Sequence, residues 1–360
     1  MSPIFQGLSR RLHDPNIRGL IVVLLLGVGL FAFFGEALAP YFAAVVVAYL
    51  MEGQIRLLEK IKLPRIVAVL MVFSLFFLLL NLLLFKLLPT LVAELSRISN
   101  EIPRITETLK RLMQQLSNYL SDFVDPEFAE SILVGLVELS QEYAAEAATL
   151  ALQGGLPGLI SVVIYLFLVP FLVFFFMKDK ELLLDSFIRF MPQERGLINQ
   201  VLKEVDTAVG GYIRGKFWEM LLLGATSYLG FAFIGFKYAF LIGILTGLSV
   251  LIPFLGLAVV TVPVIVLGIF QWGLSWEAMH PLVVYAILQI LDGNAIAPLI
   301  LGETVKVHPT TIMLSVLFFG SLWGVVGVFF AVPLWVLVKS VLEAVLFTDR
   351  PEIEAPPHEA

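Results

Sequence analysis

Cysteine is absent from this sequence, and the chemistry that depends on it is absent too. The chain can form no disulfide, has no thiolate nucleophile and offers no sulfur ligand to zinc or an iron–sulfur cluster. The four histidines are scattered and none falls in a His-Glu-x-x-His motif, which argues against a metalloprotease. No nucleophile–base pair is visible either. The sequence therefore predicts no metal site, no cofactor and no enzymatic activity.

Charge is the second shortage. Charged residues make up 14% of the 360 residues, against about 25% in a soluble domain, whereas apolar residues reach 59%. So few charges cannot cover a globular surface in water, and we expect an integral membrane protein whose first partner is the lipid bilayer. The same balance excludes a nucleic-acid-binding protein, a soluble dinucleotide-binding enzyme and a secreted disulfide scaffold.

Apolar stretches recur at the length of a membrane span, for which a helix needs about 20 residues. The candidate segments are 20–35, 37–51, 66–88, 156–177, 217–235, a long run over 238–270, 281–301 and 311–347. We predict an all-α integral membrane protein with about eight transmembrane segments. It also has a broken or re-entrant apolar pair, an extramembrane helical hairpin and a cytoplasmic amphipathic helix.

Basic residues predict the orientation, because loops rich in lysine and arginine stay in the cytoplasm. They gather in the N-terminal tail, the 52–65 loop and 178–216. Residues 89–155 then lie outside, with four basic and ten acidic residues, a net charge of −6 that equals that of the whole chain.

The predicted regions follow from these boundaries. They are a three-span membrane region (1–88), an acidic periplasmic helical segment (89–155), one span (156–177), cytoplasmic amphipathic helices (178–216), a C-terminal membrane region with broken helices (217–347) and a disordered tail (348–360).

The acidic segment carries a heptad pattern that is typical of a coiled coil. We expect Pro103 to kink or split this helix. The seam fits either a contact between subunits or packing on a neighbouring helix, 128–152, of the same chain. The predicted oligomerisation residues are Leu91, Leu95, Ile98, Ile102, Ile105, Leu109, Leu112 and Leu116.

Three places in the C-terminal region are candidates for a transport pathway. Pro253 and Gly256 interrupt the run 238–270, and this predicts either a broken helix at a substrate site or a tight hairpin. Glu303 and His308 lie in the link before the last segment and either gate a pathway or form a wet loop. Glu219, beside Lys216, is interpreted as an interfacial pair.

Asp292 is the sharpest of these candidates, because a carboxylate in hydrocarbon is costly unless it is paired, hydrated or protonated. Gln289 shares its helix face, Asn294 follows, and Pro298 loosens the backbone nearby. We expect Asp292 to carry a proton or a cation; alternatively, Asp292 and Asn294 cap a helix end.

Several short motifs carry a family likeness. They are Val169–Lys180, Tyr212–Lys216, Ile252–Gly256, Asp292–Asn294 with Pro298, His308-Pro309 and Phe319–Gly324 leading to Ala331–Pro333. In this order they resemble the autoinducer-2 exporter (AI-2E) family of bacterial inner-membrane proteins, especially its PerM permease branch. The resemblance implies a multi-span carrier with cytoplasmic termini, a homo-oligomer such as a pentameric ring, and cargo such as autoinducer-2 or sodium ions and protons.

The function we expect is transport of a small polar solute or ion across the bacterial inner membrane. Gly210–Lys216 has the spacing of a phosphate-binding loop, but Phe217 replaces the magnesium-binding Ser or Thr, so ATP is not expected to drive it. Proton coupling and export are the expected mode. The alternative is a non-transporting scaffold that binds partner proteins through the heptad segment.

Overall fold

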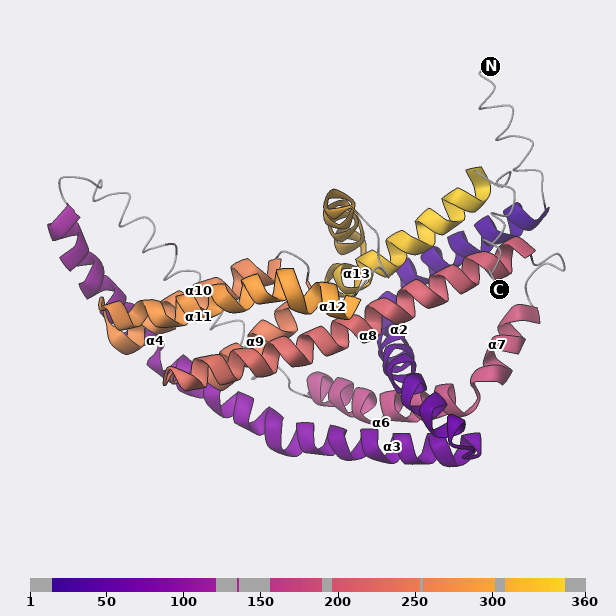
Figure 1. The fold of residues 1–360 in the computed structure, drawn as a ribbon, viewed down its shortest axis with the longest axis horizontal. Helices are drawn as coiled ribbons and strands as arrows, with labels where there is room; N and C mark the ends of the chain where they lie inside the picture. The colour runs from indigo at the N-terminus through magenta and orange to yellow at the C-terminus, as the bar shows by residue number, and fades with distance from the viewer. Residues whose placement is uncertain are drawn as a thin grey trace, which may run out of the picture. The chain divides into compact units, whose positions relative to one another are not determined.

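The computed structural model describes residues 15–120, 135, 156–189, 196–252, 255–301 and 308–346, and every regular element in these ranges is helical (Figure 1). The predicted all-α class is therefore confirmed for the described residues. The chain forms two compact units. Unit 1 holds 1–52, 175–214 and 303–360, and unit 2 holds 53–174 and 215–302.

Helix α2 corrects one expectation, because residues 20–51 were predicted as two segments separated at Glu36. They belong to a single helix, α2 (Pro15–Lys60), with Pro40 inside it and no chain reversal. One charged residue between two apolar stretches leaves the backbone hydrogen bonds of a helix intact, so Glu36 does not end it. The count of about eight spans stays a prediction.

Unit 1 contains the first part of α2. Its other parts are the end of α6 (Leu156–Lys178), α7 (Lys180–Arg189), the start of α8 (Gly196–Phe233) and α13 (Pro309–Leu346). Lys180 Nζ donates to Glu52 Oε1 at 2.8 Å, and Tyr49 Oη donates to the carbonyl oxygen of Asp206 at 3.3 Å. The lysine at the end of the Val169–Lys180 motif therefore ties α7 to α2.

Helix α13 breaks sharply at Trp323 and Gly324. The φ of Gly324 is 57°, a conformation that a side chain disfavours. Around the break Phe319 and Trp323 stack, with ring centroids 5.7 Å apart. The two halves, Thr310–Gly324 and Val326–Leu342, are each shorter than a standard span.

Unit 2 contains a continuous helical run formed by α3 (Arg65–Leu82), the π-helical turn η1 (Leu83–Leu87) and α4 (Leu88–Leu120). Pro103 lies inside α4 without splitting it, so a split at that residue was the wrong alternative. At 1.5 Å per residue the run is roughly 80 Å long, whereas bilayer hydrocarbon is about 30 Å thick. A large part of the run must therefore lie outside hydrocarbon.

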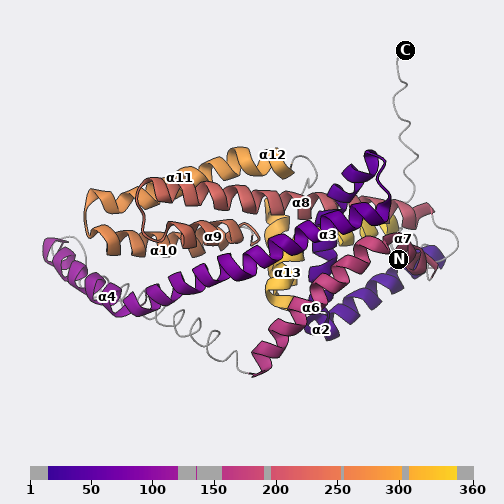
Figure 2. The ribbon, with the colours of Figure 1, turned by 90° about the horizontal axis from the view of Figure 1, so that it is seen from below.

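Besides the end of α2 and most of α6, unit 2 contains a set of antiparallel helices that follow one another along the chain. After the second part of α8 come α9 (Ala239–Ser249), α10 (Leu255–Trp272), the 3₁₀ turn η2 (Trp276–Met279), α11 (His280–Leu291), the π-helical turn η3 (Asp292–Ile296) and α12 (Ala297–Leu301). Helices α10 and α11 lie side by side in Figures 1 and 2 and pack on each other.

Helices α9 and α10 form a hairpin rather than a single broken helix. With 11 residues α9 is roughly 16 Å long, about half of what a span needs. Helix α9 packs closely on α8 at Gly247, which has no side chain. A Cβ at Gly247 would lie 2.7 Å from the carbonyl oxygen of Met220 on α8 and 3.0 Å from Gly224 Cα. Gly243, one turn earlier, also permits the close contact, since a Cβ there would lie 2.8 Å from Tyr228 Cβ on α8.

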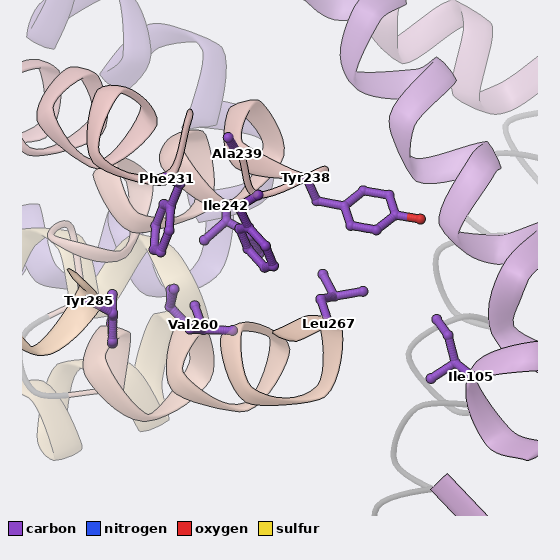
Figure 3. Packing of buried hydrophobic residues seen from close by; sticks show 10 residues of the cluster. Ile105, Phe231, Tyr238, Ala239, Ile242, Val260, Leu267 and Tyr285 are labelled. Atoms are coloured by element: carbon purple, nitrogen blue, oxygen red, sulfur yellow. The ribbon is translucent and has the colours of Figure 1, made fainter. Parts of the chain in front are cut away.

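Aromatic and aliphatic side chains from α8, α9, α10 and α11 fill the core of this hairpin, and α4 adds Ile105 to the same cluster (Figure 3). In that view the Tyr238 side chain extends toward α4, while Ile105 points back toward Leu267. The acidic helix thus packs on the α8–α9 turn and α10, whereas its predicted neighbour within the chain, 128–152, lies outside the described residues apart from residue 135.

Within the described residues, three helices are long and apolar enough to cross a membrane: Ala37–Lys60, Arg65–Thr108 and Trp276–Ile300. Shorter apolar helices accompany them, including the two halves of α13 and both arms of the α9–α10 hairpin.

Candidate functional site

A buried ion pair lies at the start of the unit 2 part of α8. Lys216 Nζ is 3.1 Å from Glu219 Oε1 and 3.0 Å from Oε2. The two residues are three apart on one helix face, and their side chains are only 12% and 3% exposed. The pair is therefore buried within unit 2, and its position at the membrane interface stays a prediction.

Helix α11 carries a polar stripe on one face. Tyr285, Gln289 and Asp292 are spaced by four and then three residues, which brings them to the same side of the helix. Tyr285 is buried and its hydroxyl donates to the carbonyl oxygen of Leu257 on α10 at 3.3 Å. Gln289 Nε2 and Asp292 Oδ1 are buried and have no hydrogen-bond partner within the described residues.

The stripe and the ion pair lie on neighbouring helices, because Leu223, one turn after Glu219 on α8, packs with Leu288 of α11 and with Ile296 of η3. We call Lys216, Glu219, Gln289 and Asp292 the carboxylate cluster. It contains two carboxylates and one ammonium, so with all three ionised it has a net charge of −1. An uncompensated buried charge is strongly destabilising, and the cluster is suited to receiving one proton or cation, or the polar groups of a solute.

The backbone at Asp292 is a π-helical turn, η3, and this corrects the expectation of a helix cap at an unwound point. Asp292 and Ala297 have right-handed helical dihedrals, and Asn294 Nδ2 donates back to the carbonyl oxygen of Ile290 at 2.8 Å. Pro298, two residues after η3, supplies no N–H for the regular i→i−4 bond, and the wider turn accommodates that gap. The earlier turn η1 likewise ends two residues before a proline, Pro89.

The tip of the α9–α10 hairpin approaches the carboxylate cluster. Val250, at that tip, packs with Leu223 of α8 and Leu288 of α11, and Ile296 of η3 joins this small core. Gly256 is buried and so close to the backbone of Ser249 that a side chain would not fit. The hairpin tip and η3 are therefore neighbours, although the sequence placed them 40 residues apart.

The open end of the same hairpin is closed by a clamp of polar contacts. Gln271 Oε1 accepts from Lys237 N and Gln271 Nε2 donates to the Gly235 carbonyl oxygen, both at 2.8 Å. These two hydrogen bonds therefore hold the end of α10 next to the start of α9. Nothing in the local sequence pattern distinguishes Gln271 from other polar residues at a helix end.

Helix α4 adds its own carboxylates to this end of the hairpin. Glu101 accepts from Lys237 Nζ at 2.9 Å and from the Tyr238 hydroxyl, and Glu94 Oε2 accepts from Leu241 N at 3.1 Å. The hydrogen bond to Glu101 raises the pKa of Lys237, and burial, then Glu101, raises the pKa of Tyr238. We call Glu94, Glu101, Lys237 and Gln271 the hairpin clamp.

The other predicted pathway residues are found at exposed positions of unit 2, in unit 1 and among the residues that the structure does not describe. Asn294 and Pro298 are exposed on their helical turns. His308 belongs to unit 1, where its Nδ1 lies 2.7 Å from Thr310 Oγ1 and accepts from Thr310 N. Pro253 and Glu303 lie outside the described residues. Within the described ranges no three His, Cys, Asp or Glu side chains gather as a metal site would require.

The predicted oligomerisation seam is used in part by the chain itself. Ile105 is buried in the core of unit 2 and Ile98 packs against the same core, whereas Leu95 is exposed. Leu91 and Ile102 are half-buried. The side chain of Leu109 lies outside the described ones, as do those of Leu112 and Leu116. Assembly through this seam stays a prediction.

Comparison with known proteins gives consistent similarities across the whole chain. The model of the AI-2E family transporter matches residues 20–347. "Putative permease PerM" of Escherichia coli K12 is 37% identical over 341 residues, which cover 95% of this chain and 96% of that protein. "Putative transport protein YrrI" of Bacillus subtilis 168 is 29% identical, covering 83% and 84%. "AI-2 transport protein TqsA" of E. coli K12 is 24% identical, covering 90% of each chain.

Proposed function

Since the chain belongs to the AI-2E transporter family, we propose that it moves a small polar solute or ion across the bacterial inner membrane and that the carboxylate cluster binds the cargo. The observation that carries the proposal is the pair of unpartnered polar atoms, Asp292 Oδ1 and Gln289 Nε2, beside the buried Lys216–Glu219 ion pair. A carboxylate and an amide left unpartnered at this depth are costly for stability alone, which favours a functional role.

The two atoms define what the cargo must offer. Asp292 accepts hydrogen bonds or holds a cation, and Gln289 Nε2 donates to an oxygen. A solute that carries both a donor and an acceptor satisfies both. Protonation of Asp292 in place of the cargo restores neutrality, and this exchange would couple export to the proton gradient without ATP.

The proposed orientation has cytoplasmic termini and an external segment 89–155. The Glu101–Lys237 contact supports it, because it brings α4 and the α8–α9 turn to one side of the membrane. Chain direction then makes α8 an outward crossing from Lys216 and α11 a return toward Asp292, with the α9–α10 hairpin entering and leaving on the external side. The basic residues of 178–216 agree with a cytoplasmic start for α8.

Autoinducer-2 is the first cargo to test, since TqsA is named as an AI-2 transport protein, and sodium is the second. A homo-oligomer, such as a ring of five subunits, is the assembly we propose from the family. A scaffold without transport is less well supported, because Ile98, Glu101 and Ile105 of the heptad helix contact the chain's own unit 2.

The test uses purified full-length protein in liposomes that enclose a pH-sensitive dye. We expect proton movement when a gradient of autoinducer-2 or of sodium is imposed, and we expect Asp292→Asn to abolish it while the oligomeric state in detergent is unchanged. Folded wild-type protein that moves no protons with either gradient, or an Asp292→Asn variant that transports at the wild-type rate, would refute the assignment of Asp292 as the coupling residue.

A further inference from the structure

Ser227 of α8 carries a buried hydroxyl group that the fold does not use. The residue is 0% exposed, and its Oγ finds no hydrogen-bond partner among the described residues. A hydroxyl inside a helix commonly donates to the carbonyl oxygen one turn earlier, and Thr226, Thr246 and Thr261 all do so. Because a hydroxyl that is buried without a partner is costly for folding, stability alone does not account for Ser227.

Two neighbours on the same face of α8 place Ser227 against α11. Leu223, four residues earlier, packs in one small core with Leu288 of α11. A Cβ at Gly230, three residues later, would lie 3.7 Å from Leu288 Cδ1. Residues three and four apart share a helix face, so Ser227 lies between two positions that both meet Leu288.

Helix α9 covers the other flank of Ser227. A Cβ at Gly243 would lie 2.8 Å from Tyr228 Cβ, and a Cβ at Gly247 would lie 3.0 Å from Gly224 Cα. Ser227 therefore lies between the row of α8 residues that meets α9 and the row that meets α11. Its side chain points into the interior of the helices α8 to α11, in agreement with its complete burial.

Asp292 reaches the same interior from α11. It lies one turn after Leu288, which meets α8, and two turns after Tyr285, whose hydroxyl donates to the Leu257 carbonyl oxygen of α10. Because α8 and α11 are antiparallel and Leu288 is level with Ser227, Asp292 is displaced from Ser227 by roughly 6 Å along the helix axes. The two side chains do not hydrogen-bond to each other.

We propose that Ser227 is a specificity-determining residue that binds a second polar group of the cargo, about one helical turn beyond the group held by Asp292. This inference rests on the proposed function in taking the carboxylate cluster as the cargo site. A serine hydroxyl donates one hydrogen bond and accepts two, so the cargo is a small solute that offers Ser227 a further hydroxyl or carbonyl group. A proton or a sodium ion at Asp292 leaves Ser227 without a partner.

The test measures binding apart from transport, as the melting temperature of purified full-length protein in detergent with and without autoinducer-2. Without cargo, Ser227→Ala should melt at or above the wild-type temperature, because it removes a buried group that has no partner. The concentration of autoinducer-2 that gives half of the ligand-induced stabilisation should rise about 2–10-fold, the value of one hydrogen bond. Thr226→Ala is the matched control and should leave that concentration unchanged, since the Thr226 hydroxyl is exposed and bonded to its own helix.

A lower melting temperature of cargo-free Ser227→Ala would overturn the proposal, because the hydroxyl would then have a structural role. An unchanged autoinducer-2 concentration in Ser227→Ala, or an equal rise in Thr226→Ala, would overturn it too. So would a wild-type protein that autoinducer-2 does not stabilise, whereas sodium-driven proton movement by that protein would leave the proposed function intact. Binding that depends on Ser227 in a protein that moves no protons would retain the role of Ser227 and reject transport.

Discussion

Lys237 Nζ donates a hydrogen bond to Glu101 Oε1 at 2.9 Å, although the two residues are 136 positions apart in the sequence. The contact joins the acidic helix α4 to the turn between α8 and α9, where Glu101 also accepts from the Tyr238 hydroxyl. An acidic helix that the sequence analysis predicts as a separate external segment is thereby attached to the start of the α9–α10 hairpin. The attachment lies at the open end of the α9–α10 hairpin, opposite the end that neighbours the carboxylate cluster.

Removing either charge of this pair should loosen α4. The Glu101 and Lys237 side chains are 24% and 52% exposed, so solvent weakens the attraction and we expect a coupling of about 0.5 kcal/mol from a double-mutant cycle of Glu101→Gln and Lys237→Gln. Thermal unfolding in detergent measures the cycle. The absence of native cysteine allows a second readout, in which paired cysteines at these positions are joined by a short crosslinker. Additive substitutions together with no crosslinking would contradict the contact.

The same pair predicts a dependence of stability on alkaline pH. The folded protein raises the pKa of Lys237 above its ordinary value, so its contribution is fully present below that ordinary value, about 10.4, and is lost as the pH rises through the higher folded value. Wild type should therefore exceed Lys237→Gln in melting temperature at pH 7 and pH 9 by equal amounts. The difference should shrink above about pH 10.5. A gap that stays constant to pH 12 would show that Lys237 stabilises through packing alone.

Sequence reasoning can pick out a polar residue as a candidate where that residue contrasts with its local surroundings. Asp292 in an apolar run is visible without any structure, and Gln289 follows from helical spacing. The burial of the Lys216–Glu219 pair was not predicted, because an i,i+3 pair near the end of an apolar stretch has the same pattern whether it is exposed or buried. Burial is a tertiary property that a single helix does not encode.

Contacts between segments that are distant in the sequence could not be predicted either, because a local pattern does not show which residues meet. Glu101 and Lys237, or Gln271 and Gly235, satisfy polar groups across helices, and many polar residues at helix ends have the same composition and spacing. The breaks were also misjudged. Glu36 and Pro103 leave their helices continuous, whereas the stretch before Pro298 widens into a π-helical turn. A helix tolerates a proline when neighbours or a wider turn satisfy the freed carbonyl, which depends on packing.

Gly247 offers a test of the close contact between α8 and α9. A Cβ at this position would lie 2.7 Å from the carbonyl oxygen of Met220, so Gly247→Ala should push the helices apart and cost about 1–3 kcal/mol of stability. Gly53 is the matched control, because a Cβ there meets nothing within 4 Å. Gly53→Ala should be neutral or stabilise α2 by up to about 1 kcal/mol. Equal melting temperatures of the two variants would argue against the contact.

Gln271 should hold the open end of the hairpin through both ends of its amide. Gln271→Glu keeps an acceptor for Lys237 N but replaces the Nε2 donor to the Gly235 carbonyl oxygen with a second acceptor. We expect a loss of about 1–2 kcal/mol and faster hydrogen exchange of the amides around Lys237. Gln271→Leu removes both bonds and should accelerate exchange further. Phe236 and Trp272 stack at the same end of the hairpin, with ring centroids 5.9 Å apart. Exchange that is unaffected in both variants would show that this stacking closes the hairpin without the amide.

Substitutions at Gln289 and Asn294 distinguish a cargo site on the buried face of α11 from one on the exposed face of η3. Gln289 Nε2 is buried and finds no partner among the described residues, whereas the Asn294 amide is exposed and donates back to the Ile290 carbonyl oxygen. If the cargo occupies the carboxylate cluster, Gln289→Ala should weaken its apparent affinity by about 2–10-fold, the value of one hydrogen bond. Asn294→Ala should leave the affinity within about twofold of wild type. Both are measured as the concentration of autoinducer-2 or sodium that gives half-maximal proton movement in liposomes. The opposite ranking would move the cargo site from the buried face of α11 to the exposed face of η3.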